Sequence, residues 1–314
     1  MSDLFETPIR GRATEFAKTM TQAGVPKRVV DLHRNTQRLP QAVIKVSSYA
    51  KSQSRAVAHA SYMTRHEKAI DDLPIEMSDG TVLRDHEEVQ AVIDDWFTQD
   101  EVRSNARRTV NIVLSSPAGT DVEQLKASVR DFSGAYFQAH DSMFVIHTDT
   151  PNPHAHLTVK TRSHHGEQLR LGRAELKDMK DVYAESLRKN GVEVQSSYRS
   201  DRGQWTPGVT QAVHHLRQAD VEQAKAARFD FKLLAPDDLA QASLTRCYQR
   251  TQNEYLGAAL FLRQAYGASY QKEAKALEAY GLALAKPAEQ ERSSSTDIHQ
   301  QPGSSPAPDA DFDR

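Results

Sequence analysis

The chain is poor in cysteine and has no long apolar run, and both absences limit what it can be. A single cysteine, Cys247, stands among 314 residues. This excludes a disulfide framework and fits a reducing cytoplasm. No stretch is long and apolar enough to predict a membrane span, and no secretory signal peptide is visible. We therefore expect a cytoplasmic protein.

Neither sign of charge dominates the composition. The chain has 40 Lys and Arg residues against 42 Asp and Glu residues, which gives a formal net charge of −2 at pH 7. Such a balance argues weakly against a nucleic-acid-binding protein, so a function of that kind has to rest on local basic clusters. A hydrophobic share of 38% and a charged share of 26% fit a globular protein with polar tails.

Histidine, by contrast, is concentrated in one short segment, HTDTPNPHAH, at residues 147–156. His154 and His156 are two apart on a predicted strand and project from the same face. The turn-forming residues 150–153 predict a hairpin that brings His147 towards them. A lone histidine is usually a surface or core residue, but three gathered imidazoles favour a divalent-metal site with open positions. Polarisation of a phosphoryl oxygen requires such positions.

Asp149 lies in the same segment, and the sequence leaves its role open. It can act as a fourth ligand, as a group that orients one of the histidines, or as a proton acceptor. No cysteine accompanies these residues, whereas structural zinc sites usually contain thiolates, so we expect a reactive site. Mg²⁺ or Mn²⁺ would suit phosphate transfer.

Three separated motifs resemble those of DNA relaxases of plasmid mobilisation and T-DNA transfer, which are histidine-hydrophobe-histidine endonucleases. They are ASYMTRHEK around Tyr62, IVLSSPAGTD with Ser115, and the histidine segment. The order Tyr, Ser, His is the relaxase order, whereas rolling-circle initiators of the same superfamily usually carry the tyrosine after the histidines. The resemblance covers about residues 41–202. One departure is Asn152, where close relatives often have another histidine.

The resemblance implies a role for each motif. Tyr62 would attack one DNA strand and form a 5′-phosphotyrosyl link, with a free 3′-OH on the other product. The metal ligands would be His147, His154 and His156, and Ser115 would contact DNA near the nick. The residues alone do not single out Tyr62 among the 10 tyrosines, and Ser115 at a strand end can equally be a turn residue.

Basic residues near these motifs are candidates for phosphate contacts. They are Arg107, Lys160 and Arg162. Lys160 is the strongest of them by position, because it shares strand parity with His154 and His156. Charged residues are more often simply solvated, so these assignments stay hypotheses.

Periodicity predicts an α+β protein, in which a central antiparallel sheet carries the metal site. We expect a two-layer sandwich with helices on one side and the other sheet face left open for metal and DNA. A helical C-terminal region would follow. The predicted parts are an N-terminal extension (residues 1–39), a relaxase endonuclease domain (40–205), a helical accessory region (206–286) and a disordered tail (287–314).

The resulting hypothesis is a metal-dependent, strand-specific relaxase that nicks supercoiled DNA at a plasmid transfer origin and accompanies the strand into a recipient cell. Its implied partners are a relaxosome accessory protein, a coupling protein and a type IV secretion system. The alternatives are a non-cutting DNA-binding protein of the same fold, a rolling-circle replication initiator, and a metal phosphoesterase that attacks with water.

Overall fold

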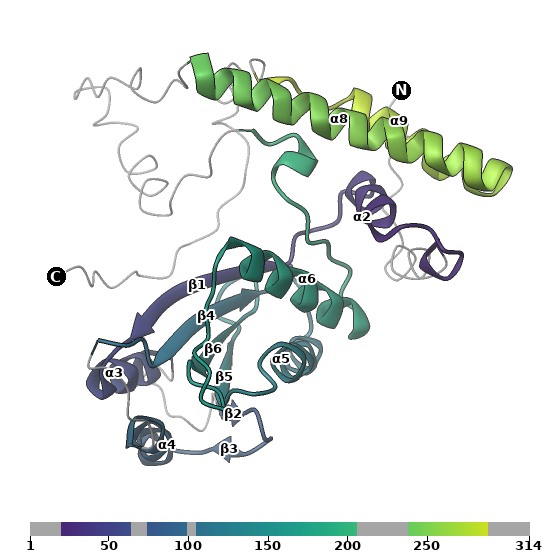
Figure 1. Ribbon diagram of the computed structural model, residues 1–314. Helices are drawn as coiled ribbons and strands as arrows, with labels where there is room; N and C mark the ends of the chain where they lie inside the picture. The colour runs from purple at the N-terminus through teal and green to yellow at the C-terminus, as the bar shows by residue number, and fades with distance from the viewer. Residues whose placement is uncertain (1–19, 64–73, 99–104, 206–237, 288–314) are drawn as a thin grey trace, which may run out of the picture. The chain divides into compact units, whose positions relative to one another are not determined.

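The computed structural model describes residues 20–63, 74–98, 105–205 and 238–287 (Figure 1). They divide into two compact units. Residues 39–196 belong to the first, and residues 20–38 and 197–287 to the second. Residues 1–19 of the predicted N-terminal extension, residues 206–237 of the predicted helical accessory region and residues 288–314 of the predicted tail lie outside the described residues.

The first unit is built on a six-stranded antiparallel sheet with the order β1-β4-β6-β5-β2-β3. The strands are β1 (Val43–Ala50), β2 (Ile75–Met77), β3 (Val82–Leu83), β4 (Thr109–Ser115), β5 (Ser142–His147) and β6 (His154–Lys160). The β5–β6 hairpin pairs His147 with His154 and Val145 with His156. The predicted turn and register are therefore confirmed.

One face of this sheet forms the main hydrophobic core. Ala155, Leu157 and Val159 of β6 are completely buried there, as the alternation of β6 predicts. Two helices cover this face, α5 (Val122–Tyr136) and α6 (Arg173–Lys189). The α+β fold is confirmed.

The opposite face is not entirely open, which differs from the expected two-layer arrangement. Helices α3 (Gln53–Met63) and α4 (His86–Thr98) pack on part of it and bury Met143 and Val145 of β5 (Figure 1). These two residues have the same strand parity as His147. The physical reason is that β5 is apolar on both faces, so its second face also needs a cover.

The helix ends explain part of the local structure. Helix α5 begins at Asp121, whose carboxylate accepts hydrogen bonds from the backbone N–H groups of Glu123 and Gln124. The spacing of Thr120 and Glu123 predicts a capping box that begins at Thr120. This prediction is wrong, because Asp121 is the cap and the Thr120 hydroxyl donates to the carbonyl of Pro117 at 2.7 Å. Apolar residues at helical spacing predict a helix over residues 173–189, which is confirmed as α6, and it ends before Gly191, whose φ of +82° favours glycine.

The second unit contains residues from both ends of the described chain. It contains α2 (Lys27–Thr36), the 3-10 helices η2 (Ser200–Arg202) and η4 (Gly267–Tyr270), and the helices α8 (Asp238–Tyr266) and α9 (Gln271–Leu282). None of the helices described is both long and apolar enough to cross a membrane.

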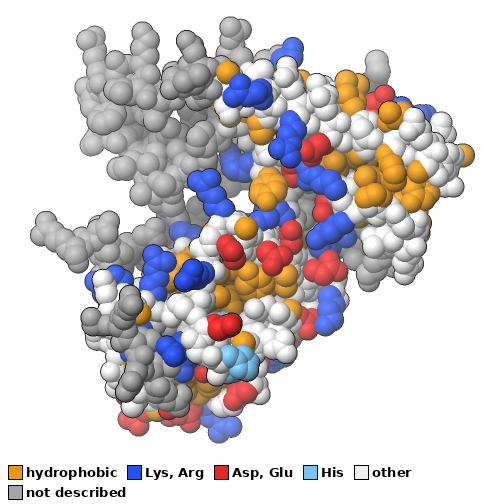
Figure 2. All heavy atoms as spheres, in the orientation of Figure 1, with side chains coloured by type: hydrophobic (Ala, Val, Ile, Leu, Met, Phe, Trp, Pro, Cys, Tyr) orange, Lys and Arg blue, Asp and Glu red, His pale blue; other side chains and the backbone are white. Residues whose placement is uncertain are grey.

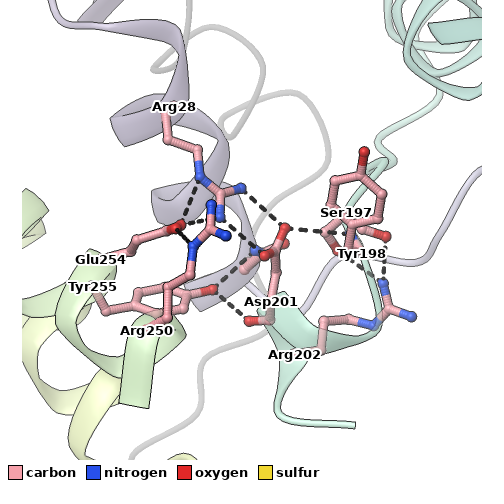
Figure 3. A network of polar contacts seen from close by, with 9 residues as sticks. Arg28, Ser197, Tyr198, Asp201, Arg202, Arg250, Glu254 and Tyr255 are labelled. Carbon is pink, nitrogen blue, oxygen red and sulfur yellow. Dashed lines mark hydrogen bonds and ion pairs between the residues drawn. The ribbon is translucent and has the colours of Figure 1, made fainter. Parts of the chain in front are cut away.

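A polar network holds α2 to η2 and α8 (Figure 3). The guanidinium of Arg28 donates to both carboxylate oxygens of Asp201 at 3.0 Å and to Glu254 at 3.1 Å. The buried hydroxyl of Tyr255 donates to the backbone carbonyl of Asp201 at 2.8 Å and accepts from Asn35 at 2.9 Å. The predicted N-terminal extension is thus, over residues 20–38, an integral part of the helical unit, and residues 197–205 also belong to that unit.

Candidate metal and nucleophile site

Three histidines meet at one end of the β5–β6 hairpin. His147, His154 and His156 each offer a ring nitrogen, and these nitrogens all lie within 4.8 Å of one another. The ring centroids are 4.6 Å apart for His147 and His156, 5.2 Å for His154 and His156, and 5.3 Å for His147 and His154. His147 is buried and the other two are half-buried. This donor set fits a single divalent cation that keeps positions open for a substrate.

Backbone carbonyls fix the tautomer of two of these rings. The Nε2 atom of His147 lies 2.7 Å from the carbonyl oxygen of Met63, and Nδ1 of His154 lies 3.3 Å from that of Asn152. A carbonyl can only accept, so each of these nitrogens carries the hydrogen. The lone pair is then on Nδ1 of His147 and on Nε2 of His154, which is the arrangement that metal-binding histidines commonly have. Asn152, which replaces a histidine of close relatives, thus orients His154 through its backbone.

Tyr62 lies beside this group. It is the penultimate residue of α3, its side chain is half exposed, and its ring centroid is 6.2 Å from that of His156, edge to face. Of the tyrosines considered from the sequence, Tyr183 is completely buried in the core and Tyr49 packs beneath the guanidinium of Arg107. Tyr62 combines exposure with contact to the histidines.

The strand register brings Ser115 to the same place. Ser115 is paired with His154 across β4 and β6, so the two side chains share a face. On β1, Val43 and Lys45 continue this face and are exposed. The part of the sheet beside the histidines that α3 and α4 leave uncovered is therefore formed mainly by β1 and β4.

Asp149, the further candidate of this segment, lies between β5 and β6. It is exposed in the turn between β5 and β6 and is not among the residues whose donor atoms converge. The structure thus does not place it as a fourth ligand within that cluster. Its roles as an orienting group or a proton acceptor remain hypotheses.

The predicted basic contacts lie at the other end of the strands. Lys160 shares the face of His154, but it is only 7% exposed, and its Nζ lies 3.9 Å from the carboxylate of Asp141. We therefore assign Lys160 to the packing of the sheet. Arg107 is exposed, with its guanidinium carbon 4.1 Å from the ring centroid of Tyr49, and Arg162 is half-buried just after β6.

Sequence reasoning missed His59, which lies next to Tyr62. His59 lies one helical turn before Tyr62, and their ring centroids are 6.3 Å apart. Burial lowers the pKa of His59 to about 4, so the ring is neutral at neutral pH. The spacing of three residues on a predicted helix was the signal that could have revealed His59.

Other features of the first unit do not compete with this site. A cavity of about 370 Å³ near the β2–β3 turn is lined by residues that include Glu76, Arg130 and Phe144. Phe144 belongs to the core beneath α5 and α6, so the cavity lies on the sheet face away from the histidines.

On the molecular face drawn in Figure 2, Lys and Arg side chains form several groups with Asp and Glu between them, so charge alone does not mark a binding surface there.

The comparison with protein families agrees with the motifs. Residues 62–192 match the family described as "Relaxase: MobA/VirD2-like, nuclease domain". No curated protein matches the chain. A solved structure described as "Molecular Basis of Vancomycin Resistance Transfer in Staphylococcus aureus" is 18% identical, covers 50% of this chain and 99% of its own, and has a TM-score of 0.37. Residues 62–192, which carry Tyr62, Ser115 and the three histidines, are thus similar to the relaxase nuclease domain of the MobA/VirD2-like family.

Proposed function

We propose that the protein nicks one strand of supercoiled DNA at a plasmid transfer origin, with Tyr62 as the nucleophile, and so initiates conjugative mobilisation. The observation that carries this proposal is the half-exposed phenol of Tyr62 beside three converging histidine nitrogens. A phenol with an ordinary pKa of about 10 is a poor nucleophile at neutral pH. It needs an activated phosphate close by.

His147, His154 and His156 would hold the divalent cation, with Mg²⁺ or Mn²⁺ as the expected ions. The bound cation would withdraw charge from the scissile phosphate. The chain's own contribution is to fix the ligand nitrogens through strand register and through the carbonyls of Met63 and Asn152. Ser115, opposite His154, would contact the DNA next to the cleaved bond.

In the proposed step, the phenolic oxygen of Tyr62 forms a bond to phosphorus, and the bond from phosphorus to the 3′ oxygen breaks. The phenolic proton leaves to a base, for which exposed Asp149 is our candidate, and the 3′ oxygen departs as a hydroxyl after taking up a proton. The phosphodiester energy is kept in the phosphotyrosyl link. The step is therefore reversible, and the freed 3′-OH can reseal the strand.

Arg107 and Arg162 would hold phosphates farther along the strand, at the other end of the sheet. Residues 1–61 and 193–314 lie outside the family match. In the proposed process, the accessory protein, the coupling protein and the type IV secretion system act with the nicked complex. They take no part in the chemistry at Tyr62.

The test is to incubate the full chain and its Tyr62→Phe variant with supercoiled DNA that carries the flanking origin region, with Mg²⁺ or with EDTA. We expect nicked DNA and a peptide containing Tyr62 covalently joined to a 5′ phosphate, both dependent on metal and both lost in Tyr62→Phe. Tyr49→Phe is the matched control and should keep the activity.

The other outcomes separate the alternatives. Metal-dependent cutting that survives Tyr62→Phe would indicate attack by water, as in a phosphoesterase. Binding of the same DNA without any cutting would indicate a DNA-binding protein of this fold. Dependence of plasmid replication, and not of transfer, on Tyr62 would indicate a replication initiator.

A further inference from the structure

The last residue of α3 is tied to the histidine cluster by its main chain. The carbonyl of Met63, directly after Tyr62, accepts a hydrogen bond from Nε2 of His147 at 2.7 Å. Met63 is completely buried and His147 is 3% exposed, so water does not compete for the bond.

The side chain of Met63 makes a second polar contact. Its sulfur lies 3.5 Å from the hydroxyl of Thr158, which is 3.0 Å from the amide oxygen of Asn111. The amide nitrogen of Asn111 in turn donates to the hydroxyl of Ser48 at 2.8 Å. Met63 thus contacts β6 through Thr158, and its carbonyl connects it to the histidine cluster through His147.

The two nitrogens of His147 have different tasks in this arrangement. Because Nε2 donates to Met63, the lone pair for a cation is on Nδ1. A cation bound at Nδ1 draws electron density from the ring and makes the Nε2 hydrogen a stronger donor. Binding of a cation at Nδ1 therefore strengthens the hydrogen bond from Nε2 to the carbonyl of Met63.

We propose that His147 is a positioning residue for the nucleophile: its Nε2 hydrogen, through the carbonyl of Met63, holds the last turn of α3 so that Tyr62 faces His156, and metal binding tightens this hold. The proposal rests on the proposed function of Tyr62. Since coupling between two sites is reciprocal, order at the end of α3 also raises the affinity for the metal.

Two substitutions of the same residue separate ligation from positioning. The side-chain amide of glutamine reaches about as far as Nε2 of histidine, so His147→Gln keeps a donor for Met63 but removes the ligand Nδ1. Asparagine is shorter, so His147→Asn loses the donor as well. His154→Asn is the matched control, because His154 is also a proposed ligand but does not bond to α3.

The experiment measures amide hydrogen exchange in residues 61–63 of the full chain, without DNA and first without metal. We expect exchange about tenfold faster in His147→Asn, because a buried hydrogen bond is lost, and within about threefold of the wild type in His147→Gln and His154→Asn. Added Mn²⁺ should slow this exchange in the wild type, and it should not do so in His147→Gln.

Equal acceleration in His147→Asn and His147→Gln, or acceleration in His154→Asn, would overturn the proposal, and so would the absence of any change. If His147→Asn does not fold, as judged by exchange in β4, the effect of Mn²⁺ on wild-type residues 61–63 decides alone. The measurement uses no DNA, so a failure of nicking or of the Tyr62 adduct leaves its outcome unchanged, and the two proposals can fail separately.

Discussion

The two ends of strand β6 carry polar residues on the same face, but these residues differ in burial and in the side chains that they contact. At one end, His154 and His156 are half-buried and converge with His147. At the other end, Lys160 is buried and lies against Asp141. Strand parity is identical at both ends, so the difference comes from what covers them. Parity assigns a side chain to a face, and packing decides whether that side chain can reach a substrate.

Helix α3 shapes the sheet face at the histidine end. It starts after β1 and packs on the same sheet face as Met143 and Val145, and it ends at Met63 beside His147. The histidine end thus receives the exposed Tyr62. The same helix that closes one part of the face therefore brings the proposed nucleophile to the other part.

The difference between the two ends of β6 is tested most directly by replacing one residue at each end. In His156→Ala, we expect nicking to fall at least about a hundredfold, because one of three ligands is lost from a site that has to polarise a phosphate. In Lys160→Met, we expect a nicking rate within about threefold of the wild type. The measurement is the initial rate of conversion of supercoiled to nicked DNA at saturating Mg²⁺. A greater loss in Lys160→Met would show that the buried end takes part in the reaction.

A second prediction concerns the buried imidazole on α3. The pKa of His59 is lowered by burial to about 4, from an ordinary value of 6.5. The unfolded chain therefore takes up this proton at higher pH than the folded chain. The free energy of unfolding of the first unit should be highest above pH 6.5 and fall by up to about 3 kcal/mol as the pH decreases from 6.5 towards 4. His59→Gln should flatten this dependence.

The two tryptophans allow this measurement unit by unit. Trp96 is buried in the first unit and Trp205 in the second. Unfolding of a Trp205→Phe background, followed by fluorescence, reports only on the first unit. This matters because burial also lowers the pKa of His33, in the second unit, to about 4. A pH dependence that persists unchanged in His59→Gln would contradict the assignment.

A smaller effect is expected from the ion pair at the closed end of β6. Asp141→Asn removes the carboxylate that lies 3.9 Å from Nζ of Lys160. We expect the free energy of unfolding in urea to decrease by about 1–2 kcal/mol, because Lys160 stays buried while it loses a countercharge. The nicking rate of the folded variant should not change. If nicking fell while stability did not, Asp141 would belong to the functional site.

The smallest effect is expected from Arg107, which is exposed. Arg107→Ala should weaken binding of single-stranded origin DNA about two- to fivefold and reduce the salt dependence of binding by about one phosphate contact. Arg173→Ala is the control, because Arg173 begins α6, a helix that covers the sheet face away from the histidines. Equal losses in both variants would indicate a general effect of charge. Binding can be followed by fluorescence anisotropy at several salt concentrations.

Much of the fold was predictable because it rests on local patterns. The alternation in β4 and β6, the turn at residues 150–153 and the periodicity of α6 each determine an element without help from the rest of the chain. The convergence of the three histidines follows from the same patterns, since a hairpin with this turn allows few registers. The relaxase motifs around Tyr62 and Ser115 are likewise local.

The sequence by itself thus determined the antiparallel hairpin and the three histidines, because short-range spacing dictates them, and the resemblance of its motifs to those of relaxases named Tyr62 as the candidate nucleophile. Only the tertiary structure decided that α3 and α4 cover part of the second sheet face, that Lys160 is buried, and that His147 bonds to the carbonyl of Met63. It also decided that residues 20–38 pack with α8, through Arg28 and Tyr255. These features depend on contacts between residues far apart in the chain, which no local pattern encodes.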